Sequence, residues 1–153
     1  MVLADLITEN LVLLGVEAGT KEEALKQTSA RLMEQGYVKE TFYSALLERE
    51  AEYPTGLALP ACDIAIPHVS PEHVKRSGIA VAVLKNAVKF RRVDDPEADA
   101  KVKIIFNIAL DRNGKQGEGL QKLMEFISDE AVLGSILRAK SAGDIIRLVG
   151  KVV

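Results

Sequence analysis

Both histidines of the chain lie in the stretch DIAIPHVSPEHV, residues 63–74. His68 follows Pro67 at the end of a short apolar run. Proline lacks a ladder donor and biases the preceding Ile66 toward extended geometry, so we expect the strand to end at Pro67 and His68 to lie in a loop at the sheet's edge. Such positions commonly hold ligands, and a neutral imidazole offers a nucleophilic nitrogen. Local context alone supports a surface histidine without function equally well.

Arg49 is the second residue whose position could serve chemistry. In a helix predicted over residues 39–53, Phe42, Ala45, Leu46 and Arg49 share one face, so a guanidinium continues an inward-facing apolar stripe. One interpretation is an arginine that stabilises the helix C-terminus through the helix dipole. The other is that its planar fork binds an oxyanion, for which phosphate has the best geometry. Both interpretations stay open from the helix alone.

Other kinds of chemistry have no clear signature. His68 and His73 are five residues apart, which suits neither one helical face nor one strand face, and Cys62 and Asp63 add only a loose cluster. We therefore expect no metal site. The chain has no G-x-G-x-x-G, Walker, H-E-x-x-H, C-x-x-C or G-x-S-x-G motif, so no cofactor is expected either.

Composition narrows the class of protein. The net charge is −2, with 48% hydrophobic and 27% charged residues, so the chain offers no basic field and nucleic-acid binding is disfavoured. The single Cys62 cannot form an internal disulfide, and the N-terminal stretch carries acids where a secretory signal would be basic. No apolar run approaches the ~20 residues that span a bilayer. We expect a cytoplasmic protein.

The chain alternates between helical and extended patterns. Thr20 and Glu23 form a capping box for a helix that ends at Gly36, and the YPTG turn at 53–56 ends the next helix. The predicted strands are 9–16, 63–67, 78–84 and 101–110, and the predicted helices are 20–36, 39–53, 117–127, 129–139 and 141–149.

These elements predict one domain over residues 1–153 of the α/β class, an αβα sandwich in which helices flank a β-sheet. A hairpin contributed by the region GIAVAVLKNAVKF, residues 78–90, would make that β-sheet mixed.

The run LLEREAEYPTGLALPACDIAIPH, residues 46–68, resembles the enzyme IIA domains of the fructose/mannitol class in the bacterial phosphoenolpyruvate-dependent sugar phosphotransferase system (PTS). Those domains carry an R-E pair, a T-G or similar turn, and an apolar-Pro-His ending. The pattern and its spacing are most similar to the galactitol-type branch. The resemblance extends over nearly the whole chain and implies the family's mixed β-sheet flanked by helices.

The resemblance implies a phosphotransferase in which His68 is the phosphoacceptor. Arg49 would be the cationic partner of the phosphoryl group and Thr55 a supporting hydroxyl. The donor would be the phosphohistidine of the carrier protein HPr, and the acceptor a cysteine of a IIB protein, linked indirectly to a membrane IIC component. The transported sugar would be a hexitol such as galactitol. Neither a nucleotide nor a metal takes part in this scheme.

This chain departs from the family's pattern at one position, and two alternative functions stay open. Many members of the class carry a second histidine near the start of the helix after the central strand, where this chain has Gln116 or a neighbour; galactitol-type members often lack it too. A regulatory IIA-like protein, whose phosphorylation state controls protein binding, would share every feature around His68. An unrelated hydrolase or binding domain could instead use His68 as a general base.

Overall fold

A computed structural model describes residues 3–112 and 116–151 of the chain. The elements, in chain order, are α1 (Leu3–Leu6), the 3-10 turn η1 (Glu9–Leu11), β1 (Val12–Val16), α2 (Lys21–Glu34), α3 (Phe42–Glu52), β2 (Gly56–Leu57), β3 (Asp63–Ala65), the 3-10 turn η2 (Pro71–His73), β4 (Gly78–Arg91), β5 (Asp99–Ala109), α4 (Gln116–Ile127), α5 (Glu130–Arg138) and α6 (Ala142–Gly150).

The strands form one mixed sheet in the order β1-β4-β5-β3-β2. β1 is parallel to β4 and β3 is parallel to β5, whereas β4 pairs antiparallel with β5 and β2 antiparallel with β3. The β4–β5 pair is a long hairpin at the centre of the sheet. Residues 78–90 do not form a hairpin of their own, because they lie in the single strand β4, whose hairpin partner is β5. The predicted mixed sheet is confirmed.

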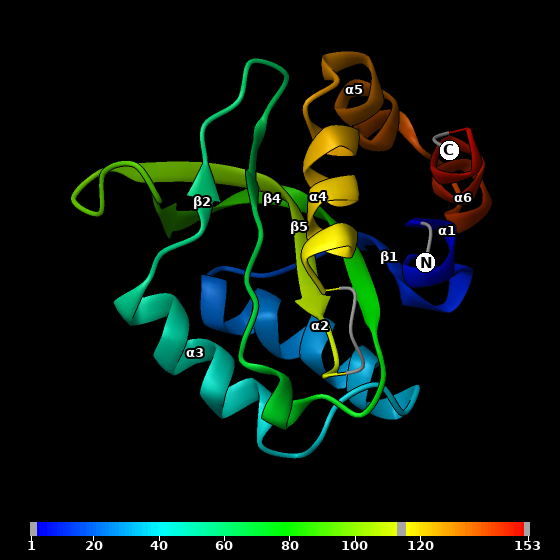
Figure 1. The fold of residues 1–153 in the computed structure, drawn as a ribbon. Coiled ribbons are helices and arrows are strands. Elements are labelled where there is room, and N and C mark those ends of the chain that lie inside the picture. Colours follow the sequence, from blue (N-terminus) through cyan, green and yellow to red (C-terminus); the bar gives the residue numbers. More distant parts are fainter. Residues whose placement is uncertain (1–2, 113–115, 152–153) are drawn as a thin grey trace.

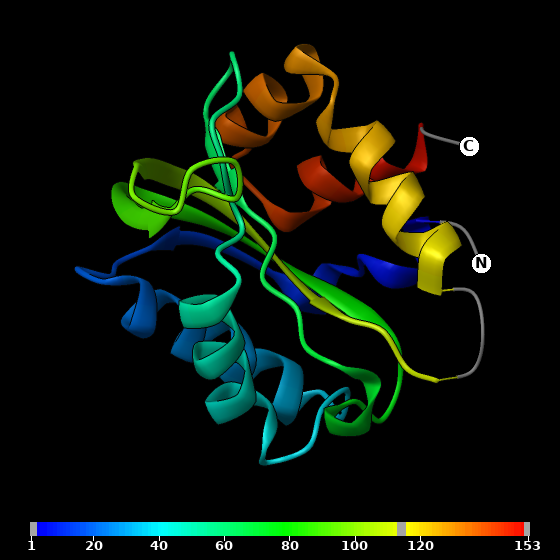
Figure 2. The same ribbon diagram turned by 60° about the vertical axis from the view of Figure 1, so that its left-hand side comes forward.

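Helices cover both faces of the sheet (Figures 1 and 2). Helices α2 and α3 pack on one face, and α1, α4, α5 and α6 pack on the other. Successive side chains of β4 alternate between the two cores: Ile79 and Val81 contact the second set of helices, and Ala80 and Ala82 contact the first. The predicted αβα sandwich is confirmed.

Most predicted elements are present with small shifts at their ends. Thr20 caps α2 by accepting a hydrogen bond from the Glu23 amide at 3.2 Å, as the capping box predicts. Some features differ. Helix α1 and strand β2 have no counterpart among the predicted elements, and β3 ends at Ala65, two residues before the end of the predicted strand. Residues 9–11 form a 3-10 turn in place of the first part of the predicted strand, and β4 continues beyond residue 84 to Arg91 after a register shift between Val83 and Val88.

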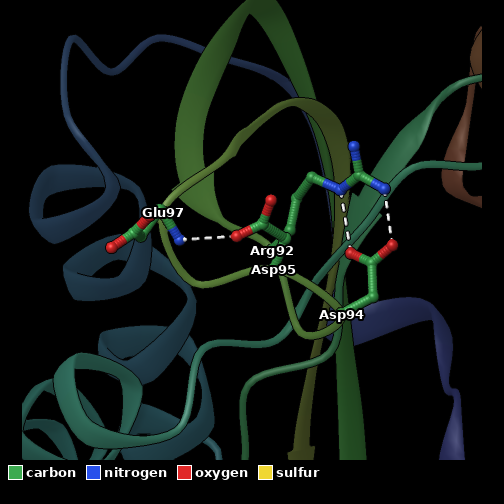
Figure 3. A network of polar contacts seen from close by, with 4 residues as sticks. All are labelled: Arg92, Asp94, Asp95 and Glu97. Carbon is green, nitrogen blue, oxygen red and sulfur yellow. Dashed lines mark hydrogen bonds and ion pairs between the residues drawn. The ribbon is translucent and has the colours of Figure 1, made fainter.

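The turn between β4 and β5 is held by its own polar side chains (Figure 3). Arg92 donates two hydrogen bonds to Asp94, with Nε–Oδ1 at 2.9 Å and Nη2–Oδ2 at 2.5 Å. These bonds lower the pKa of the Asp94 carboxyl. Asp95 accepts from the Glu97 amide at 3.1 Å. The four residues thus fix the tip of the hairpin by local contacts.

Gly56 lies within β2 and its φ is not positive, so turn geometry does not require a glycine there. Close packing does: a Cβ atom on Gly56 would lie 2.6 Å from the backbone oxygen of Arg91. The Val93 amide donates to the Gly56 oxygen at 2.9 Å. The glycine of the predicted YPTG turn therefore allows β2 to approach the end of β4.

Candidate functional site

The segment that carries His68 is attached to the end of β5. Strand β3 ends at Ala65, but the Ile108 amide donates to the Pro67 oxygen at 2.9 Å, and His68 forms an isolated parallel bridge with Ile108. Pro67 is buried and His68 is half-buried. The Pro67 carbonyl accepts this hydrogen bond, and proline has no N–H that would need an acceptor. The histidine is thus held beside the sheet and is less exposed than the sequence suggested.

The His68 ring is oriented by its own backbone. Nδ1 lies 2.9 Å from the carbonyl oxygen of Ile66. A carbonyl only accepts hydrogen bonds, so Nδ1 must carry the proton. In the neutral ring, the free lone pair is then on Nε2.

A mainly apolar hollow of about 170 Å³ lies beside His68. It is formed by the segment after His68, the end of β5 and the first turns of α4. Its lining residues are His68, Val69, Pro71, Ile108, Leu110, Gly117 and Leu120. The imidazole is the only ionisable group among these residues. A partner's apolar side chains could therefore pack around the histidine and exclude water from it.

Arg49 lines an adjacent hollow of about 210 Å³ between α3 and residues 69–73. Its guanidinium carbon lies 5.3 Å from the centre of the Tyr53 ring. Among the residues that the structure describes, the buried Nε of Arg49 has no hydrogen-bond partner. Val69 lines both hollows, so the hollow of Arg49 adjoins the hollow of His68.

Thr55 is buried, and both of its donors are directed at Glu50. The Thr55 amide and hydroxyl donate to Glu50 Oε2 and Oε1, each at 2.8 Å. Burial raises the pKa of the Glu50 carboxyl, and the bonds from Thr55 oppose this shift. The side chains are only 6% and 3% exposed. The Thr55 hydroxyl proton is therefore already in use within the protein.

Glu50 is the residue that sequence reasoning did not single out. The R-E pair placed it beside Arg49, and it follows buried Leu46 by one helical turn. A glutamate four residues after a buried leucine lies on the inward face of the helix. This spacing could have identified Glu50 as a buried residue.

Two of the remaining candidates, His73 and Cys62, are not among the residues that line the His68 hollow. His73 Nδ1 is 2.8 Å from Thr41 Oγ1, and His73 lines the hollow of Arg49. Burial, and then Asp63, raise the pKa of the Cys62 thiol, which suits a packing residue. Helix α4 begins at Gln116, whose side chain lies outside the described part of the structure.

Residues 3–112 and 116–151 contain no group of three or more His, Cys, Asp and Glu side chains that could hold a metal ion. Within the same ranges, no helix has the length and apolar character needed to cross a membrane.

Comparison with known proteins gives concordant results. Residues 5–152 match the family described as "Phosphoenolpyruvate-dependent sugar phosphotransferase system, EIIA 2". The galactitol-specific EIIA component of the PTS in Escherichia coli K12 is 32% identical over 110 residues, which cover 72% of this chain and 73% of that protein. The ascorbate-specific EIIA component of Salmonella paratyphi A is 28% identical over 153 residues, covering 99% and 97%.

A solved complex of enzyme IIA and phosphorylated enzyme IIB for mannitol, from Escherichia coli, shares the fold. The TM-score is 0.77 at 24% identity, covering 95% of this chain and 99% of that chain.

Proposed function

Because the chain belongs to the EIIA 2 family of the phosphoenolpyruvate-dependent sugar phosphotransferase system, whose members are phosphotransferases, we propose that His68 is its phosphoacceptor. The Nε2 lone pair attacks the phosphorus of the phosphohistidine on HPr. A new N–P bond forms while the donor's N–P bond breaks, and the donor imidazole keeps the electron pair. In the second step, a IIB cysteine thiolate attacks the same phosphorus and the His68 nitrogen recovers its lone pair.

The observation that carries this proposal is the hydrogen bond from His68 Nδ1 to the Ile66 oxygen. It orients the ring and leaves the Nε2 lone pair free, so no proton has to leave the attacking nitrogen. Such positioning of a nucleophile supplies much of the catalysis in phosphoryl transfer.

Arg49 is the group we assign to the phosphoryl oxygens. Its buried Nε lacks a partner among the described residues, so an oxyanion would satisfy a donor that is otherwise left unpaired. Its hollow shares Val69 with the hollow of His68, and in this scheme the guanidinium turns toward the phosphoryl group when that group arrives. Thr55 supports the site through Glu50 in this scheme, since its hydroxyl proton is bonded there.

The partners are inferred from the surface around His68 and from the relatives. The apolar hollow suits a protein surface that packs around the imidazole. The similar fold in the IIA–IIB complex supports a IIB acceptor. HPr as donor, a membrane IIC protein as the indirect partner and a cytoplasmic location complete the proposal. Protein donor and acceptor make a nucleotide or metal unnecessary for this step.

We assign a hexitol, with galactitol first, as the transported substrate. The galactitol-specific EIIA component and a mannitol-specific EIICBA component of Pasteurella multocida are each 32% identical to this chain, against 28% for the ascorbate-specific component. Galactitol comes first because the motif spacing over residues 46–68 resembles the galactitol-type branch. The sugar does not touch this domain in the proposed scheme, so transfer to the cognate IIB protein is what selects the pathway.

The test is phosphorylation by enzyme I, HPr and phosphoenolpyruvate, followed by intact-mass measurement. We expect one acid-labile phosphoryl group on the wild type, none on His68→Ala, and one on the matched variant His73→Ala. Incubation of the phosphoprotein with galactitol, mannitol and ascorbate IIB proteins should transfer the group fastest to the galactitol one. A wild type that stays unmodified would refute the phosphocarrier role, and a phosphoprotein that no IIB protein discharges would favour a regulatory role.

A further inference from the structure

A continuous set of hydrogen bonds joins Glu50 to His68. Glu50 accepts from the Thr55 amide and hydroxyl at 2.8 Å each, Thr55 O accepts from the Ile66 amide at 3.4 Å, and Ile66 O accepts from His68 Nδ1 at 2.9 Å. Strand pairing accompanies this path, because Gly56 pairs with Ala65 in the β2–β3 ladder. We call the two bonds between Glu50 and Thr55 the clasp.

The clasp is a costly way to stabilise a fold. Glu50 is 3% exposed, and no ion pair within residues 3–112 and 116–151 includes its carboxylate. Lys21 acts on this carboxylate only from beyond ion-pair distance. Burying an ionised carboxylate without a contacting cation is unfavourable, and an apolar side chain of similar size would often serve stability better. The carboxylate therefore calls for an explanation other than stability.

The position of the clasp supplies that explanation. Glu50 follows Arg49 directly in the last turn of α3, so any constraint on Glu50 also constrains the backbone of the arginine. Thr55 leads into β2, and β2 pairs with β3, which leads to His68. The clasp thus connects the two elements that carry the cation and the nucleophile.

We propose that Glu50 is a positioning residue for phosphoryl transfer, which acts through Thr55 to fix the spacing between Arg49 and His68. The inference rests on the proposed function for its catalytic meaning. It adds a residue that touches neither the phosphoryl group nor the imidazole and sets where both are held.

The clasp acts through position, because the bonds do not run through one conjugated unit. The N–H and C=O of Thr55 belong to different peptide groups, and so do those of Ile66. Charge on Glu50 is therefore not relayed to the His68 ring. A neutral side chain of the same shape should preserve the geometry: in Glu50→Gln, the amide oxygen can accept from the Thr55 N–H and the amide nitrogen can donate to the Thr55 hydroxyl oxygen.

The experiment compares Thr55→Val, which removes the hydroxyl at nearly constant volume, with the conservative variants Thr55→Ser and Glu50→Gln. Two kinds of measurement are made. NMR gives the ¹⁵N and ¹H shifts of the His68 ring, and kinetics gives the maximal rate and the half-saturation concentration of phosphoryl transfer from phospho-HPr. We expect Thr55→Val to shift the His68 ring signals and lower the maximal rate about ten- to a hundred-fold, with half-saturation unchanged. The conservative variants should restore the ring signals and most of the rate.

Thr20→Val is the matched control. It deletes a threonine hydroxyl that accepts from the Glu23 amide at 3.2 Å at the start of α2, and it should lower the melting temperature without changing the His68 signals. If Thr55→Val behaves as Thr20→Val does, the clasp is only structural and the proposal is overturned. If the wild type accepts no phosphoryl group, the proposed function fails, and the ring signals still decide whether the clasp orients His68.

Discussion

The Arg49 guanidinium stacks against the Tyr53 ring, with 5.3 Å between its central carbon and the ring centre. Tyr53 is 57% exposed, and a cation–π contact at such a site contributes only about 0.5–1 kcal/mol. The contact can therefore hold the arginine in its own hollow without preventing its movement toward a phosphoryl group. In the proposed function, the structure thus has its histidine oriented by Ile66 and its arginine in a neighbouring hollow that shares Val69.

Replacing Arg49 with lysine should slow phosphoryl transfer from phospho-HPr about 100-fold at constant pH, because a point charge cannot replace the bidentate fork in the transition state. Single-turnover kinetics would measure this loss. Arg147→Lys, at an exposed position on α6, is the matched control and should transfer at the wild-type rate. A wild-type rate for Arg49→Lys would remove Arg49 from the phosphoryl site.

Tyr53→Leu should raise the transfer rate about two- to five-fold, because it removes the cation–π contact that holds Arg49 in its own hollow. The same single-turnover assay measures the effect. A rate that falls below that of the wild type would mean that Tyr53 helps to place Arg49 for the reaction.

Stability of the wild type should decline relative to Glu50→Gln as pH rises. Burial raises the pKa of the Glu50 carboxyl, so the folded state favours the neutral acid. Its contribution is fully present below the unfolded pKa of about 4.3 and is lost as pH rises through the folded pKa. The melting temperature of Glu50→Gln minus that of the wild type should therefore increase from about pH 4 to neutral pH. A difference that stays flat, as measured against exposed Glu48→Gln, would contradict this.

Gly56→Ala should lower the free energy of unfolding by about 1–3 kcal/mol, because the new methyl group would meet the Arg91 oxygen at 2.6 Å and β2 would have to shift. Gly150→Ala, where no atom lies within 4 Å of the built Cβ, is the control and should be neutral or slightly stabilising. Urea unfolding of both variants checks the prediction. Equal stability of the two would show that β2 accommodates the methyl group without strain.

Local sequence signals predicted the parts of the fold that depend on local contacts. Helix α2 follows from Thr20 and Glu23, which contact each other within one helical turn. The extension of β4 to Arg91 was not predicted because residues 85–89 mix exposed polar and apolar side chains, and the pairing of Val88 with Val102 in β5 holds them in the sheet. Pairing across the sheet is a long-range property that the periodicity of one segment does not encode.

The candidate site also contains one part that local sequence predicts and one part that it does not. His68 could be singled out because its neighbours Ile66 and Pro67 determine its setting. The hydrogen bonds of the clasp could not be deduced from the sequence. Glutamate is a residue type that is usually exposed to solvent, and Glu50 becomes buried only when Thr55 folds back against it. Its partner lies five residues away, beyond the end of the helix.

The long β4–β5 hairpin also bears on the order of folding. Its strands are joined by a short turn held by Arg92 and Asp94. The bridge between His68 and Ile108 instead closes a long loop, which contains the whole of β4. Short loops close at a smaller entropic cost than long ones, so the hairpin is expected to be formed in the folding transition state and to show the highest φ-values in the chain. His68 would then be positioned late in folding, after the β4–β5 hairpin has formed. Substitutions around His68 should therefore chiefly accelerate unfolding.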